Sequence, residues 1–146
     1  MLYSRPCEYA LRALTYIAAN KDSRLVRSQE IAESESLPAP YLSKLLQQLV
    51  RAGLLNSVKG PKGGFKLARL PKEISLLEVV SSVDGDEGFT RCAVGLEECS
   101  DSSPCPIHDT WKPMRTEILD YMERMSLADL ADAMERKKLL VGMDSE

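Results

Sequence analysis

The sequence predicts a mainly α-helical fold that carries one small β-hairpin. Three observations support this prediction. Apolar residues recur at helical spacing along much of the 146-residue chain. A turn rich in lysine and glycine separates two short β-prone runs before residue 68. A narrow apolar seam follows after residue 106, along a single long segment. A chain of this length suits one domain, or a small domain with a long appendage.

Residues 6–20 form the first predicted helix. Pro6 suits a first helical turn, because the amide that proline lacks has no partner there. The apolar residues of this segment share one stripe, made of Ala10, Ala13, Leu14, Ile17 and Ala18. We therefore expect a helix with one buried face.

Two further helices are predicted to meet across a turn marked by prolines. Ser28 is expected to cap a short helix over residues 28–36. The next helix has Pro40 near its first turn and ends at Gly53. Its buried stripe consists of Leu42, Leu45, Leu46 and Leu49. Its opposite face has no carboxylate and presents Lys44, Gln47, Gln48 and Arg51.

A hairpin with a basic tip is predicted next. Two β-prone runs, around Val58 and over residues 65–67, flank the turn sequence KGPKGG. Its three glycines can take positive φ or let a backbone come close to DNA; they are Gly60, Gly63 and Gly64.

A well-marked helix follows over residues 74–85. Ser75 and Glu78 form a capping box at its start, and Gly85 is placed to end it. Residues 86–108 then show no convincing period and few large apolar side chains. A loop of this size inside a compact chain suggests a functional or ligand-based explanation.

The last part of the chain predicts a long helix and a short closing one. The seam alternates in steps of four and three, through Ile107, Trp111, Met114, Ile118, Tyr121 and Met125. Pro113 is tolerable if this helix begins near Asp109 or Thr110. Residues 126–140 suggest the short closing helix.

Charge is divided unevenly along the chain. Residues 1–72 carry 12 Lys and Arg against 5 Asp and Glu, whereas residues 73–146 carry 7 against 17. A basic half joined to an acidic half suggests a nucleic-acid face attached to a region that stays off the nucleic acid. The first twenty residues lack an uninterrupted apolar run, so we expect no signal peptide, no membrane span and a cytoplasmic location.

A helix pair followed by a basic hairpin is the pattern of a winged helix-turn-helix, in which the second helix enters the major groove of double-stranded DNA. The residues predicted near base edges are Tyr41, Ser43, Lys44 and Gln47. Those suited to phosphates are Arg51, Lys59, Lys62 and Lys66. Ser28, at the start of the first helix of the pair, completes the predicted DNA-binding set.

Four metal-binding side chains lie within 17 positions of the unpatterned loop: Cys92, Cys99, Cys105 and His108. Thiolates and imidazole are the ligands that iron-sulfur clusters and zinc favour. A cluster fits the wide spacing, and its binding would supply the folding energy that an apolar core does not. Structural zinc, a metal-free thiol switch and a Cys/His nucleophilic enzyme remain alternatives, although no substrate pocket is evident for an enzyme.

These features together resemble the Rrf family of bacterial winged-helix regulators, especially its IscR-like branch, which regulates iron-sulfur assembly, and its NsrR-like branch, which senses nitric oxide. The resemblance spans nearly the whole chain, through EYALRAL at 8–14, LVRAGLL at 49–55, SVKGPKGGF at 57–65, LLEVVSSVDG at 76–85, and the cysteine segment that ends in CPIHDTW at 105–111.

The resemblance implies an iron-sulfur site and a homodimer built on the long helix. Cys92, Cys99 and Cys105 match the three cluster cysteines, and His108 matches the fourth ligand of a 2Fe-2S site in the assembly-regulating branch. The gap between the first two cysteines is one residue longer than in that branch. Glu8 matches the carboxylate that the nitric-oxide branch supplies from the partner subunit, so it is the alternative fourth ligand, and the cluster could be 2Fe-2S or 4Fe-4S.

The sequence therefore predicts three regions and no enzymatic activity. Residues 1–85 are expected to form a winged-helix DNA-binding domain, residues 86–108 a cluster-binding loop, and residues 109–146 a dimerisation helix with a C-terminal segment. The expected function is transcription regulation at an operator, with DNA affinity set by a cluster that senses redox state, nitric oxide or cluster supply. The alternatives are a zinc-stabilised DNA-binding protein and a metal-free thiol redox switch.

Overall fold

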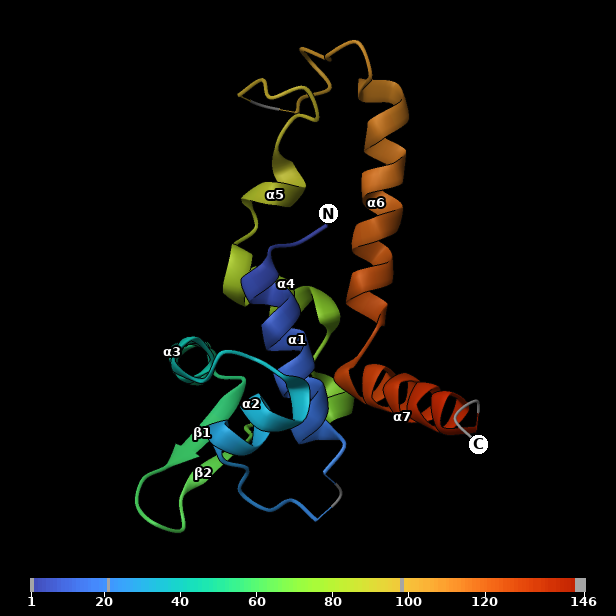
Figure 1. Ribbon diagram of the computed structural model, residues 1–146. Coiled ribbons are helices and arrows are strands. Elements are labelled where there is room, and N and C mark those ends of the chain that lie inside the picture. Colours follow the sequence, from blue (N-terminus) through green and yellow to red (C-terminus); the bar gives the residue numbers. More distant parts are fainter. Residues whose placement is uncertain (1, 21, 98, 144–146) are drawn as a thin grey trace.

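The structure, a computed structural model, describes residues 2–20, 22–97 and 99–143 (Figure 1). Its elements in chain order are α1 (Arg5–Ala18), α2 (Ser28–Glu35), α3 (Ala39–Arg51), β1 (Leu55–Val58), β2 (Gly64–Leu67), the 3-10 turn η1 (Pro71–Glu73), α4 (Leu76–Asp84), α5 (Glu87–Thr90), α6 (His108–Arg124) and α7 (Leu127–Met143). This is the predicted mainly helical fold with one hairpin. Among the described residues, no helix is both long and apolar enough to cross a bilayer.

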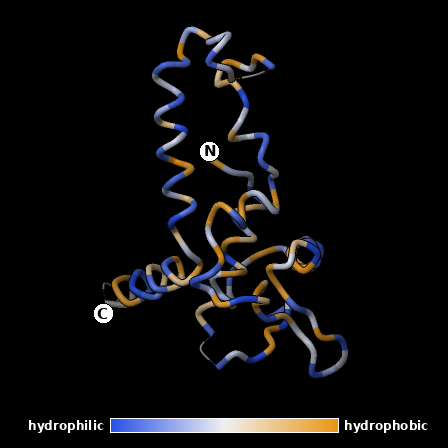
Figure 2. The backbone as a smooth tube through the Cα atoms, turned by 180° about the vertical axis from the view of Figure 1, so that it is seen from behind, coloured by the Kyte–Doolittle hydropathy of each residue, from blue (hydrophilic) through white to orange (hydrophobic). Residues whose placement is uncertain are grey.

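The core surrounds α1, which contacts α2, α3, α4, α7 and the hairpin. The predicted stripe on α1 is buried except for Ala18, which is half-buried, and the four predicted leucines of α3 are all buried. Above this body, α6 rises beside α5 and the cysteine loop, residues 91–107 (Figure 1). At the lower end of α6 the chain turns into α7, which packs against α1. Seen from behind, most of α6 is hydrophilic, with short hydrophobic stretches between (Figure 2). The fold thus places the helix pair and hairpin at one end and the cysteine loop at the other.

The helix pair forms as predicted, with one correction at its start. Ser28 does not cap α2, because the N-cap position is held by Arg27 and Ser28 already lies in the first turn. The Ser28 hydroxyl instead lies 3.5 Å from that of Ser43 on α3. A contact between the two helices therefore takes the place of the expected local cap.

The hairpin pairs β1 with β2 in antiparallel register, from Leu55 opposite Leu67 to Val58 opposite Gly64. Val26, just before α2, exchanges two backbone hydrogen bonds with Phe65, at 2.9 and 2.8 Å. At Gly63, a Cβ would overlap the carbonyl oxygen of Val58. The glycine there is required by the hairpin itself, whichever way DNA approaches.

The capping signals around α4 are confirmed. The Ser75 hydroxyl accepts the backbone N–H of Glu78 at 3.1 Å, and Gly85 follows α4 with φ +75°. After it, α5 adds a single helical turn in a region where the sequence showed no period.

The long helix begins earlier than predicted. It starts at His108 rather than at Asp109 or Thr110, and Trp111 already donates its amide to the carbonyl of Ile107 at 2.8 Å. Pro113 therefore lies beyond the first turn, where its missing amide costs α6 one backbone hydrogen bond. The expectation that this amide would have had no partner was wrong.

The junction of α6 and α7 is tied to the body. Leu76 donates its backbone N–H to Met125 at 2.7 Å, and Leu127 donates to Ile74 at 2.9 Å. Met122, on the last turn of α6, is buried in the core. The closing helix α7 forms where it was predicted, over residues 126–140, but extends three residues further to Met143 and is as long as α6.

Candidate functional site

Two of the predicted functional regions are assembled at opposite ends of the fold. The first, here called the DNA-binding surface, consists of the polar face of α3 and the hairpin. Its exposed side chains are Tyr41, Ser43, Lys44, Gln47, Arg51, Lys59, Lys62 and Lys66. Four lysines and one arginine, with no carboxylate among them, suit a phosphate backbone.

Some predicted members of this surface also have structural contacts. The Tyr41 ring meets that of Tyr9 edge to face, with centroids 5.8 Å apart. The Ser43 hydroxyl donates to the carbonyl of Ala39 at 3.1 Å, and Ser28 is half-buried beside it. Gln48, assigned to the polar face from the sequence, instead donates its side-chain amide to Ser82 of α4 at 3.3 Å. Gln48 therefore belongs to the contact between α3 and α4, and its assignment to the polar face was wrong.

The second region is the cysteine loop, residues 91–107, together with the first residue of α6. Within it, Cys92 is 5% exposed. The pKa of the Cys92 thiol is lowered, chiefly by the backbone N–H of Val94. Burial alone would raise this pKa, but the amides of Leu96 and Gly95 and the thiol of Cys105 also lower it. Amides directed at one sulfur favour the thiolate, the form of cysteine that binds metals.

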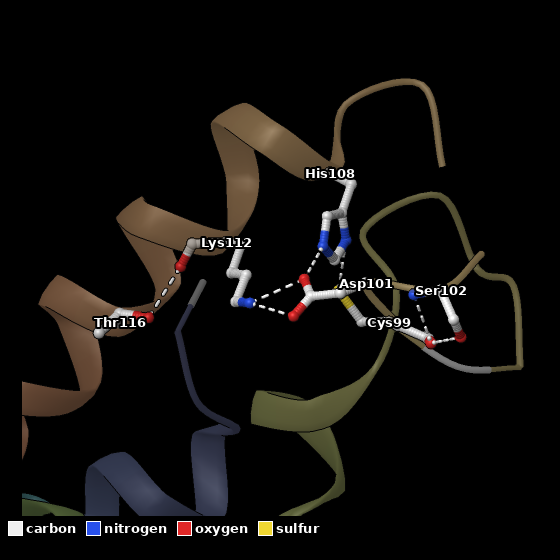
Figure 3. A network of polar contacts seen from close by, with 7 residues as sticks. Cys99, Asp101, Ser102, His108, Lys112 and Thr116 are labelled. Carbon is white, nitrogen blue, oxygen red and sulfur yellow. Dashed lines mark hydrogen bonds and ion pairs between the residues drawn. The ribbon is translucent and has the colours of Figure 1, made fainter. Parts of the chain in front are cut away.

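Two of the four predicted donors are in direct contact, since the Sγ atom of Cys99 lies 3.3 Å from Nδ1 of His108 (Figure 3). The thiol of Cys105 is one of the groups that lower the pKa of the Cys92 thiol. His108 is 4% exposed although it stands at the start of a helix. Among residues 2–20, 22–97 and 99–143, no three His, Cys, Asp or Glu side chains are grouped closely enough to hold one metal ion.

The contact between Cys99 and His108 extends into a network of charged side chains. Nε2 of His108 lies 2.8 Å from Oδ1 of Asp101. The Lys112 ammonium donates to both oxygens of the same carboxylate, at 2.7 and 2.6 Å (Figure 3). The hydrogen bond from Lys112, followed by that from His108, lowers the pKa of Asp101 to about 2.

The donor set of three thiols and one imidazole is compatible with an iron-sulfur cluster. In a 2Fe-2S centre each iron takes two protein ligands, and histidines can replace cysteines. Structural zinc uses the same types of donor, four around one ion.

The alternative ligand Glu8 lies elsewhere on the chain. It stands in the first turn of α1 and lines an open groove of about 710 Å³ between α1 and α7. Its neighbour Cys7 is fully buried in the core, and burial raises the pKa of its thiol to about 12. Cys7 is thus a packing residue of the core.

The sequence did not indicate Asp101, Lys112 or the amides around Cys92 as members of the site. Two signals were available for the side chains. Asp101 follows Cys99 by only two positions. Lys112 follows His108 by four, a spacing that puts His108 and Lys112 on one face of a helix.

Comparison with known proteins agrees with this architecture. Residues 3–133 match the profile of the Rrf2 family, described as an iron-dependent transcriptional regulator. The HTH-type transcriptional regulator IscR of Aliivibrio salmonicida (strain LFI1238) is 33% identical over 122 residues, which cover 84% of this chain and 72% of that protein.

Two solved structures extend the comparison to the fold. T. potens IscR has a TM-score of 0.72 at 26% identity and covers 92% of this chain and 88% of its own. CymR, described as the global cysteine regulator of B. subtilis, has a TM-score of 0.74 at 24% identity, over 89% of this chain and 95% of its own. The latter likeness bears on the fold alone. These relatives are transcription regulators rather than enzymes, as the sequence predicted, and the chain belongs to the Rrf2 family of HTH-type transcriptional regulators.

Proposed function

We propose that this regulator binds operator DNA as a homodimer and that an iron-sulfur cluster in the cysteine loop sets its affinity for DNA. The observation that carries this proposal is the buried position of His108 at the cysteine loop, where its Nδ1 lies 3.3 Å from Sγ of Cys99. A histidine among the donors favours a 2Fe-2S centre over a 4Fe-4S centre, because histidine replaces cysteine at some 2Fe-2S centres. A bound cluster would supply a group whose charge and presence change with redox state, nitric oxide or cluster supply.

The chain offers a physical route from the loop to the DNA-binding surface. His108 begins α6, and the far end of α6 is fixed to the body by the bonds of Met125 to Leu76 and of Leu127 to Ile74. A shift of α6 would therefore be passed to the residues that start α4. Coupling of about 1–3 kcal/mol between two sites changes affinity by roughly 5- to 150-fold.

A second connection joins the end of α4 to the start of α1. The backbone N–H of Ser4 donates to Oδ2 of Asp84 at 2.7 Å, and the Ser4 hydroxyl contacts the same carboxylate. Asp84 ends α4, which leads into α5 and the cysteine loop. Both chain segments that leave the loop thus reach the body through specific hydrogen bonds.

The homodimer is supported by the exposed seam of α6. In the single chain, Ile107, Met114 and Tyr121 are 44%, 47% and 53% exposed. Apolar side chains repeated along a helix are typical of a helix-helix interface. Two α3 helices held by such a dimer would meet half-sites whose centres lie about 34 Å, or a multiple of it, apart.

Anaerobic purification followed by iron, acid-labile sulfide and zinc analysis tests the cofactor. We expect iron and sulfide in equal amounts, about two of each per chain. Equimolar zinc without sulfide would favour the zinc-stabilised protein instead. A protein that holds neither metal, and that loses DNA binding reversibly on oxidation, would favour the thiol switch.

The fourth ligand is tested by Glu8→Ala and His108→Ala, compared by their visible absorption and circular dichroism. We expect the spectrum to change in the histidine variant and to persist in the glutamate variant. An unchanged cluster spectrum and stability in His108→Ala would remove His108 from the ligand set and favour Glu8 of the partner subunit.

A further inference from the structure

Asp101 holds a position that the ligand set alone does not explain. It is an exposed loop residue, with 71% of its side chain accessible, yet it contacts both the buried ring of His108 and the ammonium of Lys112 (Figure 3). His108 and Lys112 are separated by one helical turn, so both face the carboxylate from the same side of α6. The contacts therefore join a rigid helix to a loop with few apolar anchors.

The hydrogen bonds determine which nitrogen of His108 carries the proton. Lys112 donates to both oxygens of Asp101, as expected for an ionised carboxylate. An ionised carboxylate can only accept hydrogen bonds, so Nε2 of His108 must be the donor across the 2.8 Å contact. A neutral imidazole has one N–H, which leaves Nδ1 with its lone pair facing Cys99 at 3.3 Å.

We propose that Asp101, held by Lys112, is a positioning residue that fixes His108 in its Nε2–H form and presents Nδ1 toward the metal site. The assignment of the proton stands on the contacts alone. The role toward a metal rests on the proposed function, in which Nδ1 is a cluster ligand. Partners of this kind orient ligating histidines and raise their basicity.

Stability alone does not account for the arrangement. An exposed ion pair such as that of Lys112 and Asp101 adds little to the free energy of folding. The ion pair does restrain the Asp101 carboxylate. Lys112 donates to both of its oxygens and His108 Nε2 donates to one, so the carboxylate has a narrow range of orientations. The consequence is a ring held at both nitrogens, by Asp101 on one side and Cys99 on the other.

The first test uses the apo-protein and needs no cluster. The chain has a single histidine, so 15N-histidine labelling of the untagged protein gives the NMR signals of one imidazole. At about pH 8, above the range in which ordinary imidazoles protonate, we expect Nε2 to be protonated and Nδ1 not. Asp101→Ala should yield a mixture of the two forms, whereas Asp101→Asn, which keeps an acceptor oxygen, should restore the parent pattern.

Asp120→Ala is the matched control, because Asp120 is an exposed aspartate on α6, the helix that carries His108 and Lys112. Far-UV circular dichroism shows whether each variant still folds. Lys112→Met leaves the Asp101 carboxylate in place and removes only the group that holds it, so it tests positioning separately from folding. A proton on Nδ1 in the parent, or the same pattern in Asp101→Ala as in the parent, overturns the proposal.

The second test uses protein that carries the reduced cluster. Pulsed EPR should detect strong coupling from the 15N label in the parent. Asp101→Ala should weaken that coupling and shorten the lifetime of the cluster by about 10- to 100-fold, with Asp120→Ala unchanged. Equal coupling and lifetime in both variants would overturn the metal role of Asp101.

The failures of the two proposals can be told apart. A loaded parent without nitrogen coupling overturns the role of Asp101 and leaves the cluster-dependent regulator standing. A parent that takes up no iron and sulfide, but shows the expected proton position, overturns the proposed function and still supports the positioning of His108.

Discussion

Replacing Lys59 and Lys62 with glutamine is predicted to weaken DNA binding and to lower its dependence on salt. Both side chains are exposed at the hairpin turn. A lysine that contacts a phosphate releases condensed counterions, and each contact adds about 0.9 to the slope of log K against log salt concentration. Two hairpins per dimer would lose four contacts, which lowers the slope by about 3.6.

When salt is raised from about 50 to 200 mM, the affinity of both proteins falls. The fold-loss of the double variant should be roughly 150 times smaller than that of the parent. Fluorescence anisotropy with a duplex selected in vitro by the parent protein measures both slopes. Lys137→Gln with Lys138→Gln removes the same charge from exposed positions of α7 and should leave the slope unchanged. An unchanged slope in the hairpin variant, or an equal fall in the control, would refute the assignment of the hairpin to phosphates.

Three further predictions concern stability and reactivity. Gly63→Ala should destabilise the protein to urea by about 1–3 kcal/mol, because its Cβ would overlap the carbonyl of Val58, whereas Gly88→Ala has open space and should cost nothing; equal effects would contradict this account of the hairpin. Ser75→Ala should lower the free energy of unfolding by about 1 kcal/mol through loss of the α4 cap, and an unchanged urea midpoint would argue against it. Because burial raises the pKa of Cys7 to about 12, its thiol stays protonated below that pH, and mass spectrometry should find Cys7 unmodified by iodoacetamide in the folded apo-protein but labelled in urea; labelling at the rate of the loop cysteines would count against its burial.

The parts of the fold that depend on local signals could be predicted from the sequence. Ser75 and Gly85 mark α4 correctly, because a capping side chain and a positive φ act within one turn of the helix. The leucine stripe of α3 and the basic hairpin were found for the same reason, since their periods and turn residues are short-range features.

The errors arose where tertiary contacts override local preference. Ser28 faces Ser43 instead of capping its own helix, and Gln48 donates to a carbonyl of α4. Pro113 lies inside α6 because the loop and His108 start the helix earlier than the sequence suggested. None of these contacts can be read from residue spacing within one segment.

The candidate site was predicted as a set of donors but not as an arrangement. The spacing of the cysteines indicates four candidate donors, yet it carries no information on how they are arranged in space. The arrangement depends on tertiary structure, which places His108, at the start of α6, beside Cys99. Asp101 was missed because its role depends on a histidine seven positions away and on the helix that presents it.

The most direct test of the central claim is the DNA affinity of one anaerobic preparation, measured before and after removal of its iron and sulfide. The account predicts dissociation constants that differ by roughly 5-fold or more for the same duplex. It also predicts no such difference in a variant with alanine at Cys92, Cys99 and Cys105. Equal affinities in the loaded and stripped parent protein would contradict the coupling of the cysteine loop to the DNA-binding surface.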